Sequence, residues 1–137
     1  MLVFILFSAH NMENKCDEDV SPTCVPSVDP IEECIEKLHV NRALVEKLKS
    51  GNSKLFDKNL KRWLLCFFEK TCVMTPDGVL RQDVVLKDIP DQDKSKIEKI
   101  TSICLYQKLH FAVDTAWNYL NCFREKDPKY SVIANKI

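Results

Sequence analysis

The chain has 137 residues, the length of one globular domain with a single core, and 45% of its residues are apolar. Lys and Arg together number 20, as do Asp and Glu, so the formal net charge is zero. The two signs of charge are interspersed, whereas a nucleic-acid-binding face needs an excess of basic residues. With two glycines and no runs of alternating β-branched residues, the composition predicts an all-α fold and disfavours a β-sheet with tight turns.

The N-terminus begins with MLVFILFSA, an apolar run that is shorter than the roughly 20 residues needed to span a bilayer. Its small residues Ser8 and Ala9 are typical of a signal-peptide cleavage region, although a basic start is missing. A buried N-terminal helix is the alternative. We therefore expect a short or truncated signal peptide at 1–9, an N-terminal extension at 10–27 and one helical domain at 28–137. Seven cysteines in a chain of this size indicate an oxidising compartment.

Six amphipathic helices are predicted from apolar residues at helical spacing and from the caps and breaks between them. Asp29 and Pro30 open the first helix, Asp57 opens the third, and the sequence TPDG at 75–78 predicts a turn. The first helix is expected to begin at 29–30, and the second is a short helix that includes 44–48. The other four are expected at about 57–71, 80–87, 91–107 and 111–125. The stripe expected for 91–107 consists of Ile97, Ile100, Ile103 and Cys104.

The segment KRWLLCFFEKTCVM contains two cysteines. Their spacing bears on whether they bind a metal ion, take part in redox chemistry or form disulfides with distant parts of the chain. Cys66 and Cys72 are six residues apart, which on a helix separates their side chains by about 120° around the axis. They are poorly placed to share a metal ion, and the chain has no C-x-x-C or H-x-x-x-H pair for zinc or for redox chemistry. Cys34, Cys66, Cys104 and Cys122 each fall on or near a different predicted helix. We interpret the cysteines as disulfide links between helices, with a connectivity that spacing alone leaves open.

The stretches RWLLCFFEKTCVMTPDGVL and VDTAWNYLNCFREKDP resemble the insect odorant-binding protein family, of the pheromone-binding and general odorant-binding type. The resemblance covers about residues 28–130. Members of that family carry six cysteines on six helices, and Cys34, Cys66, Cys104 and Cys122 match the first, third, fourth and sixth. The resemblance therefore implies two bridges between helices, Cys34–Cys66 and Cys104–Cys122.

The second and fifth family cysteines would fall at Arg62 and Val113, which are bridge partners in the family. Because both ends of one bridge are absent together, the chain resembles the reduced-cysteine or Minus-C type, and Arg62 and Val113 are expected to lie near each other. Cys72 stands where the family usually has a glycine, and Cys16 and Cys24 lie in the N-terminal extension. One extra bridge is expected, either Cys16–Cys24 or one of these two to Cys72. The odd cysteine is then free or links two chains.

The resemblance also implies an apolar cavity for a small volatile or lipid-like molecule, although an aromatic stripe at helical spacing is more often ordinary core. The predicted lining set is Phe56, Leu60, Leu64, Phe68, Met74, Leu80, Val84, Ala116, Trp117, Leu120 and Phe123. A polar group that orients the ligand could come from Thr71, Tyr106, Tyr119 or Tyr130, and the sequence does not select among them.

An enzyme is the least favoured class, because the sequence shows no combination of nucleophile, base and orienting acid, no Gly-rich phosphate loop and no metal-ligand spacing. We expect no cofactor, no nucleic acid and no stable membrane insertion. The predicted function is to carry small hydrophobic molecules such as odorants or pheromones in extracellular fluid, with a chemosensory receptor or a second copy as further partners. The alternatives are a secreted helical interaction protein with a solid core and a carrier of lipids or hormones outside olfaction.

Overall fold

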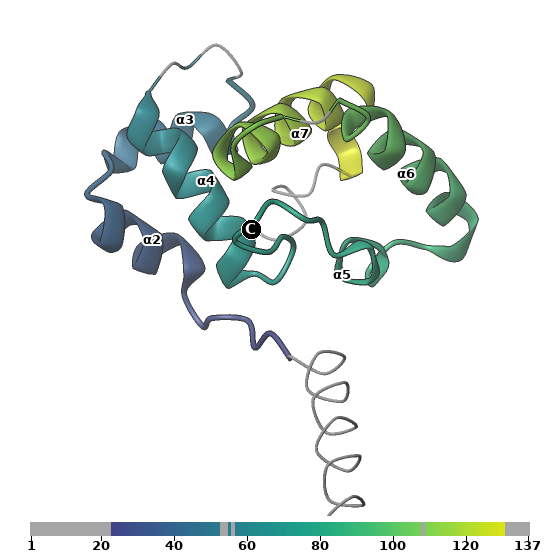
Figure 1. Ribbon diagram of the computed structural model, residues 1–137, viewed down its shortest axis with the longest axis horizontal. Helices are drawn as coiled ribbons and strands as arrows, with labels where there is room; N and C mark the ends of the chain where they lie inside the picture. Colours follow the sequence, from purple (N-terminus) through teal and green to yellow (C-terminus); the bar gives the residue numbers. More distant parts are fainter. Residues whose placement is uncertain (1–22, 53–54, 56, 108, 131–137) are drawn as a thin grey trace, which may run out of the picture.

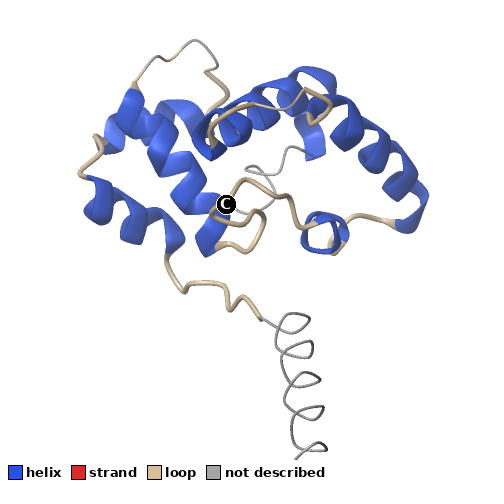
Figure 2. Cartoon of the chain, in the orientation of Figure 1, coloured by secondary structure: helices blue, strands red, loops and turns tan. Residues whose placement is uncertain are grey.

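The computed structural model describes residues 23–52, 55, 57–107 and 109–130 (Figure 1). The predicted all-α fold of six helices is confirmed, and no β-strand is drawn in the part of the chain described (Figure 2). An isolated antiparallel bridge joins Met74 to Leu80. The helices are α2 (Pro30–Leu38), α3 (Arg42–Lys49), α4 (Lys58–Lys70), α5 (Gln82–Leu86), α6 (Asp91–Cys104) and α7 (Ala112–Lys126), followed by the 3-10 turn η1 (Pro128–Tyr130).

Aspartates fix the starts of α2 and α4. The Asp29 carboxylate accepts a hydrogen bond from the backbone N–H of Glu32 (3.2 Å), and Pro30 occupies the first turn, where its missing N–H costs nothing. The Asp57 carboxylate accepts one from the N–H of Leu60 (2.9 Å). Each cap satisfies a backbone donor that has no partner within its helix, so the starts of these helices lie within two residues of the predicted positions.

The centre of the fold is the contact between α4 and α7, with α2 packed against α4 and α6 packed against α7 (Figure 1). Trp63 of α4 is fully buried. Its ring stacks on Phe67 (5.1 Å between centroids), and its Nε1 donates to the Ile31 carbonyl (3.3 Å). The fully buried side chains at this contact are Leu60, Trp63, Leu64, Phe67, Phe68, Ala116, Tyr119, Leu120 and Phe123. We call this group the α4–α7 seam.

Three disulfides join the described residues, one more than the two interhelical bridges of the predicted fold. The bridges are Cys24–Cys72, Cys34–Cys66 and Cys104–Cys122. Both pairs implied by the resemblance are present, and they tie α2 to α4 and α6 to α7. The third bridge is one of the alternatives left open by the sequence, because it links Cys24 of the N-terminal extension to Cys72.

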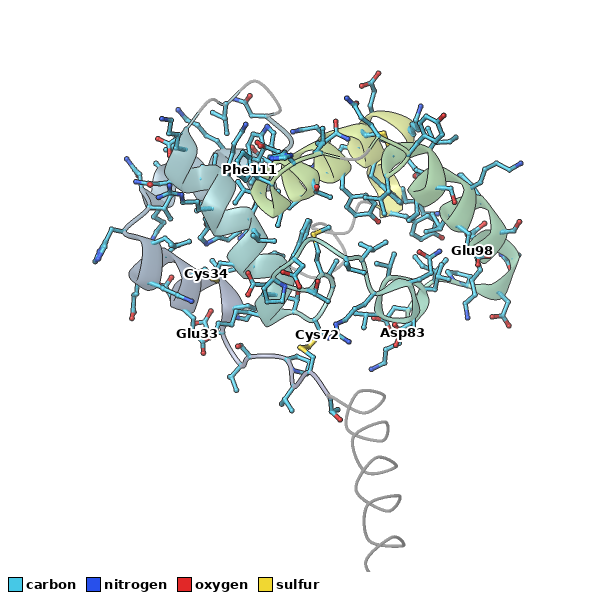
Figure 3. All side chains as sticks on the ribbon, in the orientation of Figure 1. Glu33, Cys34, Cys72, Asp83, Glu98 and Phe111 are labelled. Carbon is cyan, nitrogen blue, oxygen red and sulfur yellow. A yellow bond between two sulfur atoms is a disulfide. The ribbon has the colours of Figure 1, made fainter. Side chains whose placement is uncertain are left out.

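Cys72 ends α4 in the left-handed region, at φ 65°, a conformation that glycine adopts most readily at this position after a helix. Its disulfide to Cys24 holds residues 23–29 against this end of α4 (Figure 3). The backbone N–H of Ser27 also donates to the Lys70 carbonyl, at 2.9 Å. The N-terminal extension is therefore attached to the C-terminal end of α4.

Some predictions fall outside the described residues, namely the signal peptide at 1–9, Cys16, Phe56 and the last seven residues of the predicted domain at 28–137. On α6 the predicted apolar stripe is wrong at one position. Ile103 is 52% exposed, whereas Thr101 is buried on the same side as Ile97. The helix also ends at residue 104, earlier than the 107 expected.

Candidate functional site

The turn at 75–78 forms one wall of an open cleft beside α6. The Gly78 N–H donates to the Thr75 carbonyl (2.9 Å), and the Thr75 N–H donates to the Val79 carbonyl (2.9 Å). Gly78 has φ 85°, and a Cβ added there would lie 3.1 Å from the Cα of Ala112. A residue without a side chain is therefore needed for the turn to approach the start of α7.

The turn faces the C-terminal half of α6 across an open cleft of about 670 Å³. This volume lies within the range of about 300–1,000 Å³ that is usual for sites of small ligands. We call it the turn cleft; its lining is Asp77, Gly78, Val79, Leu80, Gln82, Thr101, Ser102, Leu105, Gln107, Leu109 and Thr115. The cleft thus has four aliphatic side chains for apolar contact together with hydroxyl and amide groups.

The most buried polar residue of the turn cleft's lining is Thr101, which is only 4% exposed. Its Oγ1 lies 3.5 Å from the hydroxyl of Tyr119, and either oxygen can be the donor. This distance is long for a hydrogen bond between hydroxyls, so both retain capacity for another partner. The Tyr119 ring is held by edge contacts with Phe68 (6.3 Å) and Phe123 (5.7 Å) of the seam. The lining residue Thr101 is therefore in contact with a tyrosine hydroxyl that close-packed aromatic rings hold in the core.

The charge of the turn cleft favours neutral ligands. Burial disfavours the phenolate and raises the pKa of Tyr119 to about 12, with the hydrogen bond to Thr101 acting in the opposite direction. Tyr119 is therefore neutral at physiological pH. Among the described residues of the lining, Asp77 is the single charged one. The arrangement can bind an apolar molecule and hydrogen-bond one hydroxyl or carbonyl.

A disulfide and a hydrogen bond fix the position of α6 relative to α7. The disulfide joins Cys104 to Cys122, and the Asn118 side-chain amide donates to the Cys104 carbonyl at 3.2 Å. These links fix Thr101 relative to Tyr119, because each lies within four residues of a linked position on its helix.

The comparisons with known proteins agree with this fold. A model of the PBP/GOBP family matches residues 29–126, more than half of the chain. The chain belongs to the PBP/GOBP family. Odorant-binding protein 10 of Aedes aegypti is 29% identical over 100 residues, which cover 70% of this chain and 69% of the relative.

Two solved structures share the fold of this PBP/GOBP family member. An odorant-binding protein of Locusta migratoria superposes with a TM-score of 0.63 at 19% identity, covering 84% of this chain and 94% of that one. Odorant-binding protein 5 of Apis mellifera superposes with a TM-score of 0.59 at 16% identity, covering 74% of this chain and 85% of that one. At these identities the likeness concerns the fold.

The structure divides the predicted lining set between two places. Leu80 lines the turn cleft, and Val84 and Trp117 are partly buried beside the core. The other described members are buried to 1% exposure or less: Leu60, Leu64, Phe68, Met74, Ala116, Leu120 and Phe123. They pack in the core behind the cleft, and their role in ligand binding stays a prediction.

The four polar groups proposed from the sequence have different surroundings. The Thr71 hydroxyl donates to the Phe67 carbonyl (2.8 Å), Tyr106 is 89% exposed, and the Tyr130 hydroxyl donates to Asp93 (2.7 Å). Tyr119 is the one that approaches the turn cleft, through Thr101.

Thr101 itself is absent from the sequence predictions. It follows Ile97 and Ile100 at helical spacing, so a stripe that admitted polar residues would have included it.

Proposed function

We propose that this PBP/GOBP family member binds and carries small hydrophobic molecules that have one neutral polar group, such as odorant-like alcohols and aldehydes. The observation that carries the proposal is the turn cleft, with aliphatic side chains in its lining and the buried Thr101, whose hydroxyl lies 3.5 Å from that of Tyr119. The names of the related proteins support the ligand class. Burial of ligand surface would provide most of the affinity, at about 25 cal/mol per Å² of apolar area.

We also propose that the protein acts in extracellular fluid, with residues 1–9 as part of a secretory signal. Three disulfides among the described residues support this, since disulfides persist in oxidising compartments. Within the described residues, no helix is both long enough and apolar enough to cross a bilayer. An olfactory role, delivery to a chemosensory receptor and homodimer formation are finer proposals that follow from family membership.

The Minus-C assignment belongs with these proposals. It is supported by the two implied bridges and by a shallow cleft that Arg62 and Val113 line together, as expected if they replace a pair of bridged cysteines. The additional bridge Cys24–Cys72 distinguishes this chain from the simple reduced-cysteine pattern.

A competition assay on the folded, oxidised full chain tests the proposal. In this assay octane, octanol and octanal are each tested as competitors of a fluorescent naphthylamine probe. The three molecules have the same chain length and differ in the polar group. We expect all three to compete, with octanol and octanal stronger than octane. The variant Thr101→Val keeps the side-chain shape and removes the hydroxyl, so it should weaken octanol binding about threefold to tenfold and leave octane unchanged.

The matched control is Thr115→Val, which makes the same change in the same cleft at a hydroxyl already donating to the Phe111 carbonyl (3.3 Å). Its effect on octanol should be smaller. Thermal melting checks that both variants fold. If the wild-type protein takes up no apolar probe, the carrier function is wrong and the interaction-protein alternative gains support.

A further inference from the structure

A second cleft of about 480 Å³ lies between the starts of α4 and α7, and its charge is opposite to that of the turn cleft. Its lining consists of Lys58, Lys61, Arg62, Phe111, Val113 and Asp114. We call it the basic cleft. Three of these six side chains are cations and one is a carboxylate, whereas the described lining of the turn cleft includes one carboxylate and no cation. The two clefts therefore suit ligands of different charge.

Only part of this positive charge is paired within the cleft. The Lys61 Nζ lies 3.5 Å from the Asp114 Oδ1 and 5.9 Å from the ring centroid of Trp117, so this ammonium is already engaged. Lys58 and Arg62 are exposed and form no ion pair with any described residue. The Asp57 carboxylate nearby is used as the cap of α4. Two cations thus remain for an external anion.

The arrangement of these cations is unfavourable for the helix that carries them. Lys58 and Arg62 are four residues apart on one face of α4, a spacing at which like charges repel. Lys58 also lies in the first turn, at the positive end of the helix dipole, and this turn contains no acidic residue. An anion bound between these two side chains would relieve the repulsion.

The apolar side of the basic cleft comes from α7 and the residue before it. Phe111 is 63% exposed, although it is among the largest apolar side chains of the described residues, and Figure 3 shows it at the start of α7. Val113 lines the same cleft and is partly buried. Cations on one wall and an exposed ring on the other match a molecule with an anionic head and an apolar chain.

We propose that the basic cleft binds a small amphiphilic anion, with its carboxylate or comparable anionic head between Lys58 and Arg62 and its chain against Phe111 and Val113. Its volume is within the usual range for a small-molecule site. Two unpaired cations are fewer than the roughly four to eight that characterise a basic membrane-binding segment. The site is separate from the turn cleft, so the proposal does not depend on the function assigned there.

Calorimetric titration of the oxidised full chain with octanoate tests the proposal, with octanol and acetate as ligands that lack the charge or the chain. The double variant Lys58→Gln/Arg62→Gln should raise the octanoate dissociation constant about fivefold to tenfold and leave octanol binding unchanged. The matched control Lys47→Gln/Lys99→Gln removes the same charge from exposed lysines on α3 and α6 and should have little effect. Phe111→Ser should weaken octanoate but not acetate.

Several outcomes would overturn the proposal. Equal loss in both double variants would mean that octanoate responds to overall charge. Loss in Thr101→Val, with none in Lys58→Gln/Arg62→Gln, would place octanoate in the turn cleft. Acetate binding as tightly as octanoate would remove the amphiphile from the proposal. Binding to phosphatidylserine vesicles without binding to soluble octanoate would identify a lipid-headgroup surface in place of a small-molecule site.

Discussion

The α4–α7 seam and the wall formed by the turn, α5 and α6 differ in how completely they are packed. Seam residues such as Phe68 and Leu120 are fully buried, and aromatic rings stack or meet edge to face along the helices. In the other wall, the turn and α5 contribute few buried side chains. α5 has five residues, of which only Val85 is buried, and Val79 in the adjacent turn is 60% exposed.

This difference separates the tasks of stability and of ligand access. Protein interiors at close packing respond to the loss of a few methylene groups, whereas a short helix and a surface turn can move at small cost. The apolar residues that the sequence assigns to ligand binding lie mostly in the rigid part, and the open cleft lies beside the turn and α5. We therefore expect a ligand that needs more room to displace the turn and α5 before it displaces α4 or α7.

The largest expected effect comes from emptying the seam. Phe68→Ala should lower the free energy of unfolding by about 3 to 5 kcal/mol, because it removes a fully buried ring that contacts Tyr119. Leu80→Ala, in the partly buried wall of the turn cleft, should cost about 1 kcal/mol and weaken octane binding. Urea unfolding measures the first and probe displacement the second. A cost near 1 kcal/mol for Phe68→Ala would show that the seam contains space, as the predicted lining set requires.

A smaller effect is expected at Tyr119, where the seam meets the turn cleft. Its pKa is raised from 10 to about 12 by burial, so the unfolded chain loses the phenolic proton at lower pH than the folded chain does. This contribution to stability is complete below pH 10 and is lost between pH 10 and about 12, by about 2 to 3 kcal/mol.

Unfolding of the wild type and of Tyr119→Phe across this range measures the contribution as a difference, since the lysines titrate in both proteins. Parallel curves for the two proteins would contradict the buried, neutral tyrosine.

The smallest effect concerns the end of α4, outside both regions. Without the Cys24–Cys72 bridge, the residue at position 72 still has to adopt φ 65°. The variant Cys24→Ser/Cys72→Gly should therefore be more stable than Cys24→Ser/Cys72→Ser by about 1 kcal/mol, because glycine accepts the left-handed conformation without strain. Thermal melting of the two variants side by side measures this difference. Equal melting temperatures would show that the backbone relaxes once the bridge is absent.

The helices could be predicted because their signals are local. Asp29 and Asp57 cap helices through bonds to residues three positions away, and Gly78 serves a four-residue turn. The interior of the seam was harder to predict, since Trp63 and Tyr119 each have a polar atom that suits an exposed position as well. Their burial depends on partners from other helices, such as the Ile31 carbonyl for Trp63.

The candidate site depends still more on long-range contacts. The turn cleft exists because Gly78 lies against Ala112 and because a disulfide joins α6 to α7. Neither contact can be derived from the spacing of residues along the sequence. The choice of Cys24 as the partner of Cys72 likewise depends on residues 23–29 running along the end of α4. Thr101 could have been found on its helix, but its distance to Tyr119 could not.

The long contact between the Thr101 and Tyr119 oxygens has a consequence for selectivity. Each hydroxyl hydrogen can rotate about its C–O bond while the heavy atoms stay in place, so the pair can present a lone pair or a proton to a guest. The same arrangement of heavy atoms would then bind an alcohol and an aldehyde of equal chain length. A carrier of this kind would distinguish ligands by the size and shape of the hydrocarbon and by the presence of a polar group, but only weakly between an alcohol and an aldehyde.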